Sequence, residues 1–235
     1  MKRSMMLIVA LSLAVFGVTA GAGPASAGSN DQAIADAGII EAGDMPATWS
    51  SSPQDRSSVK KNLAVAKRTK GCTQYVKFAV ANEATTKAES DDYELDGQQL
   101  SNLSYVHKSE AVATKLMESL QDPSVVGCLQ AVLEKGIKTE ILKDKDARRQ
   151  IDDVTLELGE TTLDEIADDQ VAYEGTLTIT LKDGSEQEID VALVALRAYR
   201  VILTYSISAP PDATDIPDVF ATALTNTLVR TYNSL

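Results

Sequence analysis

The chain of 235 residues carries 22 basic and 34 acidic side chains, which give it a formal net charge of −12. This acidity argues against a nucleic-acid partner and against binding to anionic lipid surfaces, because like charges repel. The two cysteines form no CxxC pair and His107 is the only histidine. We therefore expect no metal site and no cofactor.

The start of the chain has the organisation of a secretory signal peptide. A basic start (Lys2, Arg3) precedes an uncharged apolar run over residues 5–18 and the small residues Ala25-Ser26-Ala27. Signal peptidase recognises this A-x-A pattern, and the apolar run is shorter than the roughly 20 residues of a spanning helix. The sequence predicts a signal peptide over residues 1–27, cleavage after Ala27 and one secreted domain over residues 28–235. A retained N-terminal anchor is the alternative.

The mature domain is expected to have no membrane anchor, because no cysteine follows the apolar run and no second long apolar run exists. Outside the cytoplasm the redox setting favours disulfides, and two cysteines allow one pairing within the chain. We therefore expect a Cys72–Cys128 disulfide, with two free buried thiols as the alternative.

The first part of the mature domain predicts two helices and a loop. Ser29-Asn30-Asp31 supplies a cap for a short helix that Gly43 and Pro46 end. The polar stretch SSSPQDRSS predicts a surface loop. After it, the spacing of Val59, Leu63 and Ala66 predicts a helix over residues 59–70.

The other faces of that second helix are basic. They carry Lys60, Lys61, Lys67 and Arg68, the one cationic cluster in an acidic chain. A solvated surface balanced by nearby carboxylates is the simpler interpretation, and an anion-binding patch is the functional one. We expect an anionic ligand if this helix borders a cleft, and an apolar ligand held by strand residues if it faces open solvent.

The middle of the chain predicts helices around a pair of strands. Residues 72–81 fit a strand or a helix, and we favour a helix because Cys72, Tyr75, Val76, Ala79 and Val80 form a helical stripe. Strands are expected at 92–95 and 100–107, with His107 on the core side. Two helices follow, over 109–121 and from Asp122-Pro123 to Lys135, where Gly136 marks the end.

Four runs in the C-terminal half alternate between apolar and polar residues. The apolar positions are Val154, Leu156 and Leu158; Tyr173, Leu177, Ile179 and Leu181; Ile189, Val191, Leu193 and Ala195; Val201, Leu203, Tyr205 and Ile207. Period two predicts an antiparallel sheet, and the third run, apolar on both faces, predicts a central strand. With a last helix over 215–232, this pattern predicts a single α+β domain: an antiparallel sheet of about five to six strands flanked by helices.

The turn LKDGSE determines how the second and third alternating runs pair with each other. A two-residue Asp-Gly loop would pair Leu177 with Asp190, so that apolar and acidic side chains would share a face. A three-residue loop, 182–184, pairs Leu177 with Ile189 and Tyr173 with Leu193 instead. It requires Gly184 to take a left-handed conformation.

Catalytic motifs are missing from the sequence. It contains no GxSxG, HExxH, P-loop or glycine-rich dinucleotide turn. A catalytic role for His107 is disfavoured because that residue is expected in the core. The acidic pairs Asp91-Asp92, Asp152-Asp153 and Asp168-Asp169 lack the spacing of a calcium loop and indicate solvated loops.

Several stretches together resemble a known family. They are GDMPATW, a cysteine after a polar-to-basic stretch, LSNLSYVHKSEAVATKLMESL, a cysteine-bearing helix, VALVALRAYRVILTYSIS and the closing amphipathic helix. Over about residues 30–235 the chain resembles the extracellular sensor domains of actinobacterial membrane Ser/Thr protein kinases, which also occur as free secreted proteins. This chain departs from them in having one cysteine pair where two disulfides are usual, and Arg197-Ala198-Tyr199-Arg200 where Arg-Gly is common.

The resemblance implies an antiparallel sheet flanked by helices around a ligand-binding cleft, with no catalytic residues. We therefore expect a secreted, non-enzymatic binding or sensor-like module. Its partner would be an unidentified small molecule, a cell-wall fragment or a protein. The alternatives are a secreted hydrolase that uses carboxylates alone and a protein-interaction module. A pocket with two facing carboxylates would favour the hydrolase, and an apolar cleft with few polar groups would favour binding.

Overall fold

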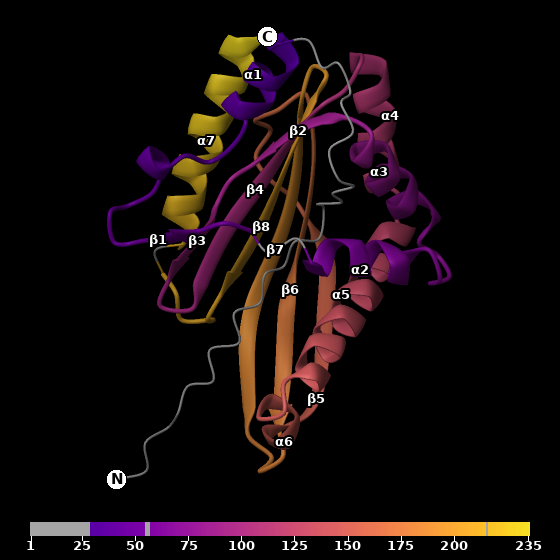
Figure 1. Cartoon of the computed structure of the whole chain (residues 1–235), viewed down its shortest axis with the longest axis vertical. Helices are drawn as coiled ribbons and strands as arrows, with labels where there is room; N and C mark the ends of the chain where they lie inside the picture. The colour runs from indigo at the N-terminus through magenta and orange to yellow at the C-terminus, as the bar shows by residue number, and fades with distance from the viewer. Residues whose placement is uncertain (1–28, 55–56, 215) are drawn as a thin grey trace.

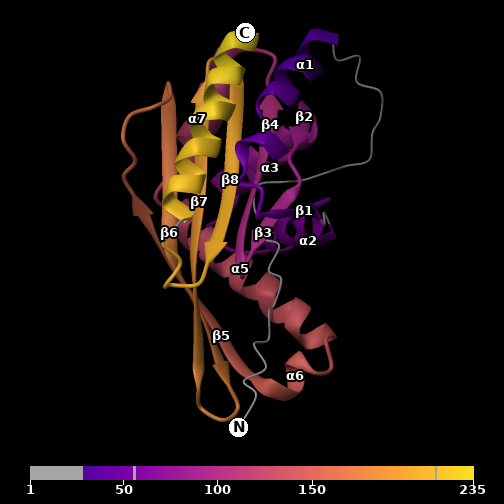
Figure 2. The same cartoon turned by 90° about the vertical axis from the view of Figure 1, so that its left-hand side faces the viewer.

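The computed structural model describes residues 29–54, 57–214 and 216–235, and for residue 29 and residues 57–60 it describes the backbone alone. The expected signal peptide and its cleavage site at Ala27 lie outside these residues. The described chain forms an α+β domain in which one eight-stranded antiparallel sheet packs against helices on both faces (Figure 1 and Figure 2). The expected fold class is thereby confirmed.

The elements have the following bounds. The helices are α1 (Ser29–Ala37), the short 3-10 helix η1 (Ala42–Asp44), α2 (Ser57–Ala66), α3 (Thr73–Glu83), α4 (Glu110–Leu120), α5 (Ser124–Lys143), α6 (Ala147–Gln150) and α7 (Ile216–Ser234). The strands are β1 (Ser50–Ser52), β2 (Thr86–Glu89), β3 (Asp92–Leu95), β4 (Gln98–Val106), β5 (Ile151–Thr161), β6 (Asp169–Leu181), β7 (Glu186–Ala198) and β8 (Val201–Ala209).

The strand order in the sheet is β1-β3-β4-β8-β7-β6-β5, and β2 also pairs with β4. The count of eight exceeds the expected five to six because β1 and β2 were not predicted. All three residues of β1 are exposed serines, and β2 buries Ala88 alone. Neither strand shows apolar alternation, so each is defined by its backbone pairing with β3 or β4 and not by its side chains.

Helices α2 to α6 cover one face of the sheet. Their core contains Leu156, Tyr173, Leu177 and Leu193 from the strands, with Phe78, Met117 and Leu129 from three of the helices. The other face is covered by α1 and α7, which pack Ile34, Leu224 and Leu228 on Leu203 and Tyr205. The domain is therefore a three-layer structure with two separate cores.

Strand β7 has the central position that its sequence predicts. It lies between β6 and β8, and it contributes Leu193 to one core and Val194 to the other. The register of the β6–β7 hairpin is also confirmed, because Leu177 pairs with Ile189 and Tyr173 with Leu193. Gly184 has a φ of +84°, the left-handed conformation that the three-residue loop requires.

Helix α5 does not end at Gly136, as predicted, but continues to Lys143. A Cβ atom at position 136 would lie 2.7 Å from Oδ1 of Asn62, a buried residue of α2. Glycine here allows two helices to approach each other, and it does not end one. The prediction was wrong because a glycine within a helix can serve tertiary packing as well as termination.

Candidate functional site

A shallow hollow of about 560 Å³ lies on the outward side of α3. It is lined by Ala66 at the end of α2, by Lys67, Thr69 and Cys72 in the loop, and by Thr73, Val76, Lys77, Val80 and Ala81 of α3. We call it the α3 hollow. Its size falls within the range of small-molecule sites. No strand residue lines it, so it differs from the cleft between sheet and helices that the family resemblance implied.

Two stripes on α3 explain why the hollow is apolar. The inner stripe of Tyr75, Phe78, Ala79 and Asn82 is buried against the sheet and its helices. The outer stripe of Thr73, Val76, Lys77, Val80 and Ala81 has the same helical spacing and faces the hollow. Val80 is 41% exposed although it is a large apolar residue. The single stripe inferred from the sequence therefore divides into a buried inner stripe and a more exposed outer stripe that lines the hollow, and Val76 and Ala81 of the outer stripe also pack against the core.

The charge of the α3 hollow is positive. Lys67 and Lys77 are its only ionisable lining residues, and no carboxylate is among the described residues that line it. The Lys77 ammonium donates to the neutral Gln74 amide at 3.0 Å, and Gln74 donates onward to Asp122 at 3.4 Å. Lys67 makes no ion pair with any residue that the structure describes. The hollow is thus a positively charged surface region on an acidic protein.

The expected disulfide is confirmed and lies beside the hollow. Cys72, directly before α3, is bonded to Cys128 of α5, with 5.0 Å between their Cα atoms. Both cysteines are buried. Gly71, with a φ of +89°, turns the chain into this bond. The bond fixes the start of α3, and with it one end of the hollow, to the helix that packs on β5.

The three predicted cations whose side chains the structure describes are not brought together. Lys67 lines the hollow, whereas Lys61 pairs with Glu140 of α5 at 3.0 Å and Arg68 is exposed outside the lining. The side chain of Lys60 lies outside the described residues. The second lysine that lines the hollow is Lys77, which was not among the predicted cations. It could have been found from the sequence by its spacing from Thr73, Val76 and Val80, which puts it on the same face of the helix.

His107 lies in the core, on the buried side that the strand pattern predicts. It is 3% exposed, and burial lowers the pKa of its imidazole to about 4, so the ring is neutral near pH 7. It does not line the α3 hollow.

Three carboxylates gather around one buried guanidinium. Arg197 of β7 contacts Asp169 at 2.7 Å, Glu110 at 3.3 Å and Asp168 at 3.7 Å. This arrangement uses the acidic groups as ion-pair partners of Arg197. It differs from a pair of free carboxylates facing each other across a pocket.

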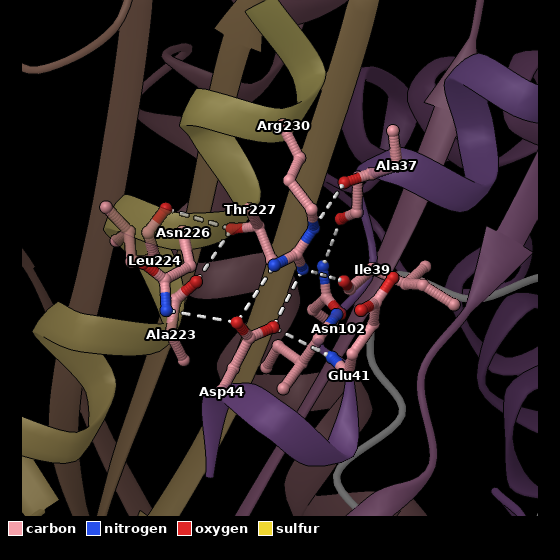
Figure 3. Close-up of polar contacts among 12 residues, drawn as sticks. Ala37, Ile39, Glu41, Asp44, Asn102, Ala223, Leu224, Asn226, Thr227 and Arg230 are labelled. Carbon is pink, nitrogen blue, oxygen red and sulfur yellow. Dashed lines mark hydrogen bonds and ion pairs between the residues drawn. The ribbon is translucent and has the colours of Figure 1, made fainter. Parts of the chain in front are cut away.

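A second polar cluster joins the first and last helices (Figure 3). The Arg230 guanidinium of α7 donates to both oxygens of Asp44 and to the carbonyls of Ala37 and Ile39. Burial alone would raise the pKa of Asp44, but hydrogen bonds from Arg230, the Glu41 N–H and Asn226 outweigh it and hold that pKa below its usual value. The Arg230 guanidinium and the Asp44 carboxylate both have their partners within the protein, which marks the cluster as structural.

Among the described residues, no group of three or more His, Cys, Asp or Glu side chains is arranged to hold a metal ion. In the same ranges of the chain, no helix combines the length and hydropathy that a bilayer crossing requires.

Comparison with known proteins assigns no family. No protein-family model and no curated protein matches the sequence. Among solved structures, a mutant of the protein Mog1 is similar with 14% identity and a TM-score of 0.19, over 61% of this chain and 73% of that one. The Saccharomyces cerevisiae Ran-binding protein Mog1p is similar with 12% identity and a TM-score of 0.18, over 64% of this chain and 91% of that one. Similarity this weak supports no conclusion about fold or function.

Proposed function

We propose that this protein is a secreted, non-enzymatic ligand-binding module of the sensor-domain type, and that its ligand binds in the α3 hollow. The observation that carries the proposal is the composition of that hollow: an apolar floor, two lysines, two threonines and no carboxylate among its described lining residues. A few polar groups on an apolar concave surface are typical of binding sites.

The competing hydrolase hypothesis has less support. It needs two carboxylates on opposite sides of a pocket, one of them with a raised pKa. The carboxylates that gather in this domain do so around Arg197, and the α3 hollow is lined by none among the residues described. The single histidine is buried and neutral, so it offers no accessible base.

The binding proposal is tested by a thermal-shift screen of cell-wall fragments, phosphorylated metabolites and lipids. A ligand at 100 times its Kd stabilises the folded state by about 2.7 kcal/mol. Val80→Glu should abolish the shift, because it places a charged side chain in the hollow. Val229→Glu is the matched control, since Val229 is an exposed valine of α7 outside the hollow.

Binding that survives Val80→Glu would place the site elsewhere. Turnover of a bound compound, abolished by changing a single Asp or Glu, would overturn the non-enzymatic proposal.

The secretion part of the proposal has a separate test. N-terminal sequencing of protein recovered from the culture medium should find Gly28 first, because the A-x-A pattern ends at Ala27. Recovery of protein that begins at Met1 from the medium would refute the signal peptide.

A further inference from the structure

We infer that the ligand of the α3 hollow is an anionic amphiphile with one acidic head and one alkyl chain. This inference rests on the proposed function and specifies the chemical class of ligand for the same site. Its head would lie at Lys67 and Lys77, and its chain would cover Val76 and Val80.

The acidic head follows from the charge of the hollow. Two lysines line it without a carboxylate among the described lining residues, although acidic residues outnumber basic ones by 34 to 22 in this chain. The hydrogen-bond partner of Lys77 is a neutral amide, the Asp122 carboxylate beyond that amide interacts with Lys77 only through space, and Lys67 has no ion pair to any described residue. A cationic or zwitterionic head would lose this complementarity, because the hollow offers its positive end no partner.

The alkyl chain follows from the floor of the hollow. Ala66, Val76, Val80 and Ala81 give it an apolar surface, and the buried disulfide at Cys72 belongs to the same lining. The core on the other side of α3 is already filled by Phe78 and Ala79, so Val80 is not needed there and remains 41% exposed. Covering these side chains with hydrocarbon removes apolar area from water, which a free inorganic anion cannot do.

The single chain follows from size and shape. A hollow of about 560 Å³ formed by the end of α2, one loop and α3 suits a small ligand and is no tunnel for a lipid with two chains. The lining also includes two neutral hydrogen-bonding groups, the hydroxyls of Thr69 and Thr73. The Thr69 hydroxyl donates to the Val65 carbonyl, which leaves its oxygen able to accept.

The experiment is a titration of the ¹⁵N-labelled mature protein, residues 28–235, with five probes: octyl phosphate, octanoate, octanol, octyltrimethylammonium and inorganic phosphate. Octyl phosphate and octanoate separate a phosphate head from a carboxylate head, and either one supports the inference. Each should bind at least tenfold more tightly than octanol, octyltrimethylammonium or phosphate alone. The amide shifts should be confined to residues 66–81.

Matched variants locate the charge. Lys67→Met and Lys77→Met together should weaken binding of the anionic amphiphile at least tenfold and leave octanol binding within twofold. Lys61 of α2 pairs with Glu140 and lies outside the hollow, so Lys61→Met should change neither the affinity for the anionic amphiphile nor that for octanol by more than twofold. All variants alter exposed side chains, and an unchanged amide spectrum in the absence of probe verifies the fold.

The outcomes separate this inference from the proposed function. Equal binding of octanol and octyl phosphate in the hollow, or no binding of any probe, overturns the inference. The proposed function then stands or falls by the Val80→Glu and Val229→Glu screen. Loss of binding in Lys61→Met equal to that in the double variant also overturns the inference, because the charge would then act at a distance and not in the hollow.

Discussion

Arg230 and Asp44 form a two-point ion pair between the last helix and the 3-10 helix near the start of the domain. The Nη1–Oδ1 distance is 2.8 Å and the Nη2–Oδ2 distance is 2.7 Å (Figure 3). The same guanidinium donates to two backbone carbonyls, that of Ala37, the last residue of α1, and that of Ile39, two residues further on. One side chain therefore supplies partners for a buried carboxylate and for the C-terminal end of a helix.

Replacing Arg230 by Ala should destabilise the domain by about 3 kcal/mol, because Asp44 would remain buried without its cation and the two carbonyls would lose their donor. Arg149→Ala is the control: its ion pair with Asp146 is long, at 3.6 Å, and exposed, so a change of no more than about 0.5 kcal/mol is expected. Equilibrium unfolding in urea measures both. Equal midpoints for the two variants would show that the cluster contributes nothing.

His107 should make stability fall with acidification in a defined window. Its pKa is about 4 in the folded domain against 6.5 for the free side chain. A depressed pKa means that the unfolded chain takes up the proton first, so stability is full above pH 6.5 and is lost as the pH falls to about 4. The loss amounts to about 3 kcal/mol at roughly 1.4 kcal/mol for each pH unit.

The check for His107 is the free energy of unfolding between about pH 7 and pH 4 in the parent and in His107→Gln. The variant should be flat over most of this window, whereas Asp44 acts at lower pH because its pKa is below the usual 3.8. An equal slope in both proteins would contradict the assignment to His107.

Two glycines of the same helix should respond differently to alanine. In an exposed helix interior, Gly→Ala stabilises by roughly 1 kcal/mol. Gly127→Ala should gain this, since nothing beyond the local backbone of α5 lies within 4 Å of a Cβ there. Gly136→Ala should be less stable than Gly127→Ala by at least about 1 kcal/mol, because its methyl group would meet the buried Asn62 at 2.7 Å. Thermal unfolding of the two variants side by side decides this. Equal gains in stability would mean that α2 can shift to accommodate the methyl group at position 136 without a loss of stability.

Loss of the disulfide should be costly as well. Cys72 and Cys128 are 56 residues apart, and the chain-entropy estimate for closing such a loop is about 4 kcal/mol. The double Ser variant should lose stability on this scale and should also bind hollow ligands more weakly, because the start of α3 is no longer tied to α5. In the unreduced parent protein, iodoacetamide should label neither cysteine under denaturing conditions. Labelling of both would disprove the bond in solution.

Much of the sheet could be predicted from the sequence because its strands bury one or both faces. Period two located β5 to β8, and a one-residue slip in the β6–β7 hairpin would have exchanged apolar for acidic side chains, so Gly184 and the register followed. The disulfide followed from the number of cysteines and the expected compartment.

The features that the sequence did not predict depend on contacts between distant segments. Gly136 is explained by Asn62, a residue of another helix, and β1 exists only as a partner of β3. For the α3 hollow, the sequence indicated Lys67 but grouped it with Lys61, whose partner Glu140 comes from α5. Val76 and Val80 were placed on one stripe with Tyr75 and Ala79 because periodicity alone does not separate two apolar stripes on one helix.

The pairing of the first and last helices has a consequence for the order of folding. Strand β4 pairs with β8, about a hundred residues later, and the Arg230–Asp44 pair spans 186 positions. Neither contact can form until the C-terminal segment is available, and such long-range closure is slow. A nascent chain that lacks α7 has the β8 surface of Leu203 and Tyr205 uncovered. Completion of the second core therefore waits for α7.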